Sequence, residues 1–297
     1  MSNLENNAAK FENDNLKAKD FLELTGNAKI KITIPQSIIL NKDCDSMRLA
    51  VYTYLFIRRG RDDIFYFSVN TMLDWMHKKI NRHKGGVNDK AVELLNYLKD
   101  QKYILFDSSV FEKEKVDENG KIRKVNIWEN FFGMKFNVDT MQKEIDNDSY
   151  TVLYWDEVLA IMNYKNIGKK DVYVNNTIIL LIFAWIRLKI GRRLNRIDER
   201  KRSQDWIEAW TCYYIDIAND LGISEKMVSK CVNVLKELGL IYYERIPASK
   251  LSDTDYRTNH VIFVNQYKRE GNLLLASGKD YYMNELQKKK NTIQVRW

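Results

Sequence analysis

The chain has 297 residues, 45% of them hydrophobic and 30% charged, and it carries a formal net charge of +8 at pH 7. A chain of this length and apolar content can build two domains of ordinary size, which excludes a largely disordered protein. The basic excess favours a polyanionic partner, and both nucleic acid and an anionic membrane surface fit it. The longest apolar run, Ile178–Ile186, has nine residues, whereas a membrane-spanning helix needs about 20, so we expect a buried helix and no membrane span.

Cysteine usage and the first residues indicate the compartment. Cys44, Cys212 and Cys231 are far apart, odd in number and without a CxxC pair, so we expect buried thiols in a reducing, cytoplasmic environment. The opening residues, MSNLENNAAKFENDNLKAKD, mix acidic and basic side chains and do not have the apolar centre of a signal peptide. Residues 1–28 are assigned to a polar N-terminal arm.

The apolar spacing in the first half predicts helices and strands in a definite order. In chain order we expect a strand over Lys29–Leu40 running into Pro35, a helix over Met47–Arg59, a strand over Phe65–Val69, a helix over Thr71–Lys79, a helix over Asn88–Lys102 with Asn88 as its N-cap, a strand over Tyr103–Phe106, and a hairpin over Val110–Val125 that turns at Asp117–Gly120.

The second half predicts a similar order. We expect a long apolar helix over Val172–Ile190, a basic insertion, a strand over Ala209–Tyr214, helices over Asp216–Leu221 and Glu225–Leu238, and strands over Leu240–Ile246 and His260–Asn265. The segment NYLKDQKYILF (Asn96–Phe106) is also similar to NVLKELGLIYY (Asn233–Tyr243), with four identical positions. Together these features predict a duplication, with domains at 29–146 and 150–268 and a C-terminal tail at 269–297.

The two short helices of the second half carry the most specific pattern. Gly222 supplies a left-handed turn that ends the first helix, and Ser224 is expected to cap the second. The apolar positions of the second helix are expected to face inward, and they are Val228, Cys231, Val232 and Leu235. Its polar positions are expected to face outward, among them Lys226, Ser229, Lys230 and Asn233.

The run LGISEKMVSKCVNVLKELGLIYY (Leu221–Tyr243) resembles the winged helix-turn-helix superfamily. It has the small helix, the glycine turn, the Ser-capped second helix and a Leu-Gly-Leu-Ile entry into the wing. The resemblance implies an α+β fold with two tandem winged-helix domains. It also implies that the second helix enters the major groove of double-stranded DNA, where polar side chains can reach base edges, and places Lys226, Ser229, Lys230 and Asn233 at the DNA. The alternative is a helix pair that serves packing or dimerisation.

The first half resembles the same fold less closely, because Gly85-Gly86 followed by Val87 and Asn88 replaces the usual single glycine and short apolar residue. Its surroundings are strongly basic, and basic side chains contact phosphates without reading sequence. The residues expected to do so are Lys84 and Lys90 near the helix and Lys121, Arg123 and Lys124 in the hairpin. A solvated charged face is the alternative.

A third basic feature is the segment RLKIGRRLNRIDERKR (Arg187–Arg202), which we interpret as an insertion in the second domain. Its arginines suit bidentate phosphate contacts, and those expected at DNA are Arg192, Arg193, Arg196 and Arg200. Lys250 and Arg257, in the polar loop before the last strand, complete the predicted DNA-binding set. A mobile, solvated loop is the alternative for Arg187–Arg202.

Catalytic patterns are weak in this sequence. The three histidines, His77, His83 and His260, form no HxH or HExxH motif, and no GxxxxGK[ST] or GxSxG motif occurs. We therefore expect no enzyme activity, no cofactor and no metal site.

The tandem arrangement is similar to that of plasmid and phage replication initiators. That resemblance implies binding to repeats at an origin, with a homodimer and a helicase or helicase loader as candidate assemblies. Two other classes stay open: a winged-helix transcriptional repressor of a mobile element, and a protein-interaction scaffold that uses winged helices without DNA.

Overall fold

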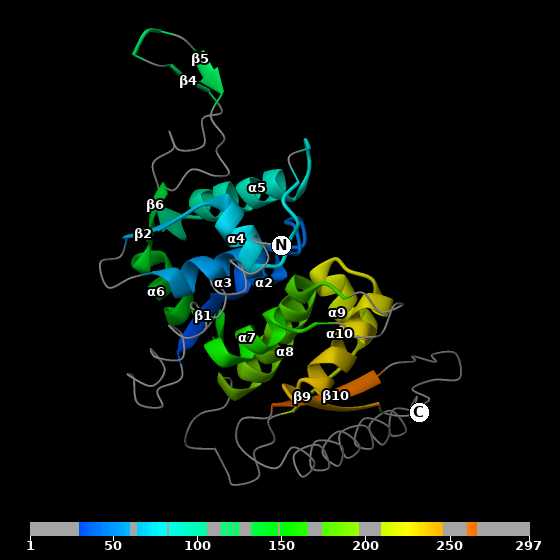
Figure 1. Cartoon of the computed structure of the whole chain (residues 1–297). Coiled ribbons are helices and arrows are strands. Elements are labelled where there is room, and N and C mark those ends of the chain that lie inside the picture. The colour runs from blue at the N-terminus through cyan, green and yellow to red at the C-terminus, as the bar shows by residue number, and fades with distance from the viewer. Residues whose placement is uncertain are drawn as a thin grey trace, which may run out of the picture.

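The computed structural model of the chain describes residues 30–59, 64–81, 83–105, 114–116, 118–120, 122–124, 132–147, 149–165, 174–195, 209–245 and 260–265. Within these ranges, helices alternate with small antiparallel sheets (Figure 1). The predicted α+β class is therefore confirmed.

The first unit comprises the described residues from 30 to 147. Its elements are β1 (Lys31–Pro35), α2 (Gln36–Leu40), α3 (Arg48–Arg58), β2 (Ile64–Phe67), α4 (Val69–Trp75), α5 (Val87–Asp100), β3 (Ile104–Leu105), β4 (Glu114–Val116), β5 (Ile122–Lys124), β6 (Phe132–Phe136) and α6 (Val138–Asp146). The sequence did not predict α2, β6 or α6.

Two boundaries in the first unit differ from the prediction for local reasons. The strand expected over Lys29–Leu40 ends at Pro35, where a helix begins, because proline's fixed φ and missing N–H suit a helix start. The strand expected to reach Val69 stops earlier, because Ser68 and Thr71 form a capping box that starts α4. At the other end, α4 stops at Trp75, and His77 adopts a positive φ of 54°.

The second unit comprises the described residues from 149 to 265. Its elements are β7 (Tyr150–Tyr154), α7 (Trp155–Met162), α8 (Asn176–Asn195), β8 (Ala209–Tyr213), α9 (Tyr214–Leu221), α10 (Glu225–Glu237), β9 (Ile241–Arg245) and β10 (His260–Asn265). The helix pair α9–α10 and the strands β8, β9 and β10 confirm the predicted elements, whereas β7 and α7 were not predicted.

The two units repeat one topology. The first has a three-stranded sheet in the order β2-β6-β3, and the second has one in the order β8-β10-β9, so in each the last strand lies between the strands that flank the helix pair. The end of the second helix also repeats: Lys102 (φ 61°) and Gly239 (φ 67°) are both left-handed. In both units the next N–H donates to the carbonyl five residues back, at 2.9 Å and 3.0 Å. The predicted repeat of element order is confirmed.

The units join through a two-stranded sheet made by β1 and β7, which pair antiparallel along their whole lengths. Each strand leads straight into a helix, and the two helix starts make equivalent bonds. The N–H of Gln36 donates to the carbonyl of Ser149 at 2.7 Å, and the N–H of Trp155 donates to the carbonyl of Ile30 at 3.0 Å. A local two-fold relation therefore links the units across the predicted boundary at 146–150, and the domain ranges themselves stay predictions.

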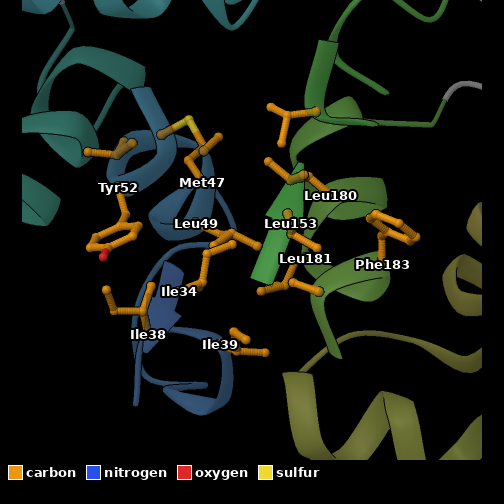
Figure 2. Close-up of a cluster of buried hydrophobic side chains, with 14 of the residues drawn as sticks. Ile34, Ile38, Ile39, Met47, Leu49, Tyr52, Leu153, Leu180, Leu181 and Phe183 are labelled. Carbon is orange, nitrogen blue, oxygen red and sulfur yellow. The ribbon is translucent and has the colours of Figure 1, made fainter. Parts of the chain in front are cut away.

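Helix α8 lies at the centre of the core. It packs against β7, α7 and α10 and also against α2 and α3 of the first unit. Figure 2 shows side chains from β1, α2 and α3 meeting those from β7 and α8. Phe183 and Trp185 are buried, so the predicted burial of Ile178–Ile186 is confirmed. Truncating one such side chain to alanine typically costs about 2–5 kcal/mol, so packing on this helix stabilises both units.

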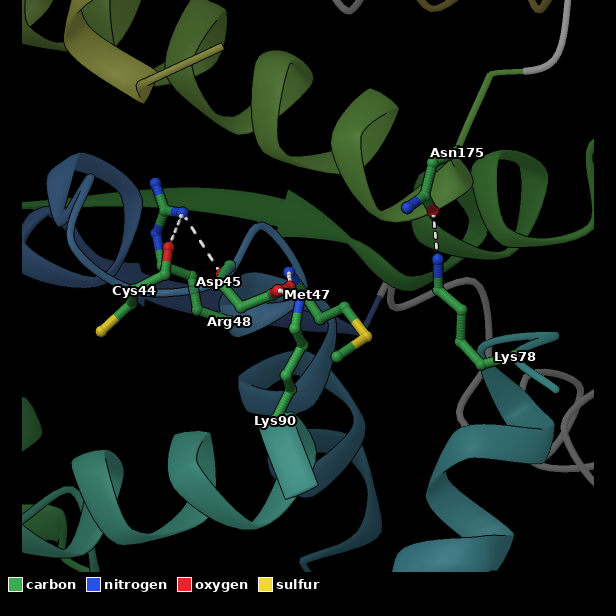
Figure 3. Close-up of polar contacts among 7 residues, drawn as sticks. All are labelled: Cys44, Asp45, Met47, Arg48, Lys78, Lys90 and Asn175. Carbon is green, nitrogen blue, oxygen red and sulfur yellow. Dashed lines mark hydrogen bonds and ion pairs between the residues drawn. The ribbon is translucent and has the colours of Figure 1, made fainter. Parts of the chain in front are cut away.

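The loop between α2 and α3 is held by a buried arginine. Arg48 is 1% exposed, and its guanidinium donates to the carbonyls of Ile38 and Ile39 at 2.8 Å each. It also donates to the carbonyl of Cys44 at 3.2 Å (Figure 3). These bonds satisfy carbonyls left open at the end of α2, and burial lowers the pKa of the guanidinium. The fixed loop includes Lys42, which lies against the second unit's helix pair.

Candidate nucleic-acid interface

The turn between α9 and α10 depends on a glycine for two reasons. Gly222 has φ 69° and ψ 36°, the left-handed conformation that the sequence predicted. A Cβ at this position would also stand 3.2 Å from the Cβ of Lys42, closer than most side chains tolerate. Glycine therefore permits both the turn and the close approach of the first unit.

Helix α10 begins where the sequence predicted. The hydroxyl of Ser224 accepts a hydrogen bond from the N–H of Met227 at 3.3 Å, and Glu225 lies in the first turn. The serine satisfies an open N–H, and the carboxylate complements the positive end of the helix.

The inner face of α10 is apolar and fully buried. Val228, Cys231, Val232 and Leu235 have no exposed surface, which confirms the prediction for each. Burial raises the pKa of the Cys231 thiol to about 12, so this cysteine packs as a neutral apolar side chain.

The helix pair is tied by polar contacts to α8 and to the segment that follows α7. The indole Nε1 of Trp185 donates to a carboxylate oxygen of Asp220 at 2.9 Å, and the ammonium of Lys189 lies 3.0 Å from the same oxygen. The hydroxyl of Tyr164 donates to Glu237 at 3.1 Å. These contacts hold α9 and α10 at a fixed angle to the core.

The outer face of α10 carries the residues predicted to contact DNA. Lys226, Ser229, Lys230 and Asn233 follow at i, i+3, i+4 and i+7 and therefore form one stripe. Lys226 and Asn233 are exposed, and Ser229 and Lys230 are half-buried. Their outward placement is confirmed, and their contact with DNA stays a prediction. The exposed Lys236 extends the stripe by one turn.

One contact at this stripe was not predicted from the sequence. The hydroxyl of Tyr243, on β9, donates to Oδ1 of Asn233 at 2.6 Å, and the ammonium of Lys236 lies 5.2 Å from the centre of the tyrosine ring. The signal was the close return of the chain at Gly239. Gly239 is six residues after Asn233 and four before Tyr243, so β9 runs back beside the last turns of α10 and can bring Tyr243 to Asn233.

The start of the equivalent helix α5 differs from the prediction. Gly86 is the N-cap, whereas Asn88 lies inside the helix and is fully buried. The Asn88 side chain accepts from the N–H of Asn81 at 2.8 Å and donates to Asn70 at 3.1 Å. The prediction that Asn88 caps this helix is therefore wrong, because its amide crosslinks the turn to α4.

Local geometry explains why glycine occupies both positions before α5. Gly85 has a φ of 74°, and a Cβ at Gly86 would stand 2.7 Å from the carbonyl oxygen of His83. The doublet that departs from the winged-helix pattern therefore permits a tighter turn.

The outer face of α5 differs in charge from that of α10. The ammonium of Lys90 lies 3.1 Å from a carboxylate oxygen of Asp45, so this predicted DNA contact is engaged within the chain (Figure 3). Glu93, Asn96 and Asp100 are exposed on the same helix. Lys84 is exposed in the turn before the helix, as predicted.

The predicted hairpin exists, with β4 and β5 pairing antiparallel and Lys115 opposite Arg123. It extends away from α5 and the rest of the first unit (Figure 1). Arg123 and Lys124 are in β5. The remaining predicted contacts Lys121, Arg196, Arg200, Lys250 and Arg257 lie outside the described residues.

The basic segment Arg187–Arg202 was predicted to be an insertion, and this is wrong for its first part. Helix α8 continues to Asn195, because the apolar positions Leu188 and Ile190 remain buried, so Arg192 and Arg193 belong to the helix. Arg187 is 8% exposed and lies 3.5 Å from Glu157. It is therefore a buried ion-pair partner of α7.

No protein-family model matches the chain, and no curated protein matches it. Among solved structures, the chain is similar to the crystal structure of RctB domains 2-3 (RctB 155–483), with 9% sequence identity and a TM-score of 0.33. The match covers 74% of this chain and 80% of that chain. The interpretation of the interface therefore rests on the chain's own residues.

The described residues contain neither a helix that could span a membrane nor a cluster that could hold a metal. Among them, no helix is both long and apolar enough to cross a membrane. Within the same ranges, no group of three or more histidine, cysteine, aspartate or glutamate side chains could hold a metal ion.

Proposed function

We propose that this protein is a sequence-specific double-stranded DNA-binding protein without enzyme activity, built from two winged-helix domains in tandem. The observation that carries the proposal is helix α10. It is capped by Ser224, preceded by the left-handed Gly222 and anchored by a fully buried inner face, and its outer face presents Lys226, Lys230 and Asn233. A capped, rigid helix with cations and an amide on its open side suits the major groove.

The repeated topology supports the tandem winged-helix assignment. In each unit one strand precedes the helix pair and a second strand follows it. The third strand, which comes last in the chain, lies between these two in the sheet. Two such units on one chain can contact two neighbouring stretches of duplex. The extended β4–β5 hairpin is the wing of the first domain in this proposal, with Arg123 and Lys124 as phosphate contacts.

The units divide the work in this proposal. Helix α10 reads bases, whereas α5 does not, because Glu93 and Asp100 on its exposed face would repel phosphates and Lys90 is held by Asp45. The first unit then supplies affinity through Lys84 and the hairpin. We propose that the protein acts in the cytoplasm on repeats at a plasmid or phage origin, as a replication initiator that dimerises and recruits a helicase or helicase loader.

The experiment is selection of bound sequences from a random duplex pool with the full chain, followed by a footprint on the selected site. We expect one enriched motif and a footprint longer than a single domain covers. Lys230→Ala should lose the motif preference, and Lys31→Ala, an exposed lysine on β1, is the matched control. A chain that enriches no motif and binds no duplex at low salt would contradict DNA recognition and favour a protein-binding scaffold.

A second measurement separates the initiator from the repressor. A plasmid whose only candidate origin contains the selected repeats should replicate only in cells that express this protein. A chain that lowers transcription from a promoter containing the motif, and supports no replication, would identify a repressor.

A further inference from the structure

The tyrosine on β9 restricts what Asn233 can offer to a base. The Tyr243 hydroxyl donates to Oδ1 of Asn233 at 2.6 Å, a short and direct bond between the sheet and the exposed face of α10. Among the described residues, the amide Nδ2 of Asn233 has no hydrogen-bond partner, and the residue is exposed. The oxygen side of the amide is therefore engaged with the protein, and the nitrogen side is available.

Lys236 helps to keep the tyrosine in place. Its ammonium lies 5.2 Å from the centre of the Tyr243 ring, within the range of a cation–π contact, and it is one helical turn beyond Asn233. Tyr243 is half-buried, so its ring also packs against the core. The hydroxyl thus reaches Asn233 from a ring that is held on two sides.

This arrangement changes the expected base. A free asparagine pairs with adenine through two bonds, in which Oδ1 accepts from N6 and Nδ2 donates to N7. With Oδ1 turned toward β9, the amide presents only its two N–H donors to the groove. Guanine offers two neighbouring acceptors, N7 and O6, on its major-groove edge, whereas adenine offers N7 beside a donor. A donor-only amide therefore favours guanine.

We propose that Tyr243 is a positioning residue that turns Asn233 into a donor-only contact and so makes this position of the DNA site select guanine. The proposal rests on the proposed function and refines it. It differs from the simple expectation of an adenine contact, because the bond to Tyr243 holds Oδ1, the acceptor that adenine needs, toward β9 and away from the groove.

The test uses the full chain and the duplex selected from the random pool. The contacted position is the one whose preference disappears in Asn233→Ala, and affinity is measured with each of the four base pairs there. For the wild-type chain we expect guanine to bind about 5- to 100-fold more tightly than adenine. Replacing that guanine by 7-deazaguanine, which has no N7 acceptor, should weaken the wild-type complex and leave the Asn233→Ala complex unchanged.

The decisive variant is Tyr243→Phe, which keeps the ring and its contact with Lys236 and removes only the hydroxyl. We expect the preference for guanine over adenine to fall about three- to tenfold, because the amide can then rotate and accept from adenine N6. Affinity for random duplex, its salt dependence and the melting temperature should not change. Tyr66→Phe, at a tyrosine that is 70% exposed on the other sheet, is the matched control. In the Asn233→Ala background, Tyr243→Phe should have no further effect on base preference.

Failure of this inference can be told from failure of the proposed function. A wild-type chain that selects a motif but prefers adenine at this position overturns the inference and leaves DNA reading intact. The same holds if Tyr243→Phe keeps the full guanine preference. A wild-type chain that selects no motif overturns both.

Discussion

Gly222 of the second unit lies directly against Lys42 of the first, so that a Cβ on the glycine would stand 3.2 Å from the lysine Cβ. The turn of the candidate reading helix is thus packed against the loop that Arg48 holds between α2 and α3. Through this contact the position of α10 depends on the first unit as well as on its own core.

Replacing Gly222 by alanine should destabilise the protein more than the same change at Gly85. Both glycines have a positive φ, which costs an alanine about 1–2 kcal/mol. At Gly85 no atom lies within 4 Å of the added Cβ, whereas at Gly222 the Cβ meets Lys42. Urea unfolding of the two variants measures the difference. Adding Lys42→Gly should recover part of the stability lost in Gly222→Ala and none of that lost in Gly85→Ala. Equal losses at the two glycines would mean that the contact with Lys42 carries no energy.

The repeated helix end predicts a stabilising substitution. Lys102 holds the left-handed position that glycine occupies in the second unit at Gly239. Lys102→Gly should therefore remove backbone strain and stabilise the protein by up to about 1 kcal/mol. The reciprocal change Gly239→Lys should destabilise it by about the same amount or more. Thermal melting of both variants measures the effect, and a lower melting temperature for Lys102→Gly would show that its side chain makes a contact worth more than the strain.

Local signals in the sequence predict the helix pair well. Gly222, Ser224 and the apolar spacing over Val228–Leu235 act within a few residues of one another, so the pattern contains the whole structural reason. The bounds of His260–Asn265 are also those of β10, because a run of alternating β-branched and aromatic residues is sufficient to define a strand.

Features that depend on distant partners could not be predicted in the same way. β1 becomes half of a sheet only because β7 pairs with it from more than one hundred residues away. Neither strand's own residues indicate which strand it will pair with. Asn88 has the composition of an N-cap, yet its role is decided by Asn70 on a separate helix. Likewise, the orientation of Asn233 depends on a hydroxyl that approaches from the next strand.

The exposed lysine at the start of α10 should contribute affinity without specificity. Lys226 lies in the first turn of the helix, two residues after its cap Ser224, and a helix N-terminus is a favourable place for a phosphate. Lys226→Ala should weaken binding to the selected and to random duplexes by a similar factor. The slope of log affinity against log salt should fall by about one, as expected for one lost phosphate contact. Fluorescence anisotropy over a salt series measures both. Lys31→Ala is the control, and an unchanged slope in Lys226→Ala would place this lysine away from the DNA.

The buried thiol on α10 predicts a loss of stability at alkaline pH. Burial raises the pKa of Cys231 from its usual value of 9.0 to about 12, so the folded state keeps the proton that the unfolded state releases. A raised folded pKa gives stability that is fully present below about pH 9 and is lost progressively as the pH rises toward 12. Cys231→Val, which keeps a similar volume without a titrating group, should make this fall less steep. The measurement is the midpoint of urea unfolding for wild type and variant at several pH values between about 8 and 11. This interval covers the ionisation of an exposed thiol in the unfolded chain. Parallel curves for the two chains would show that the thiol does not titrate on unfolding.

The buried ion pair between Arg187 and Glu157 should stabilise the protein only as a pair. The arginine is 8% exposed and the glutamate 2% exposed, their charged atoms lie 3.5 Å apart, and the glutamate also accepts from the N–H of Tyr154 at 2.8 Å. Arg187→Ala removes the cation that lies 3.5 Å from this buried carboxylate, and breaking a buried ion pair from one side typically costs about 3–5 kcal/mol. Arg187→Met combined with Glu157→Gln removes both charges, keeps most of the volume and leaves the glutamine oxygen to accept from Tyr154. We therefore expect the double variant to recover most of the stability that Arg187→Ala loses, and chemical denaturation of the three chains measures it. If Arg187→Ala costs less than about 1 kcal/mol, the pair is solvated like a surface ion pair, and α8 is then not fixed to α7 by charge.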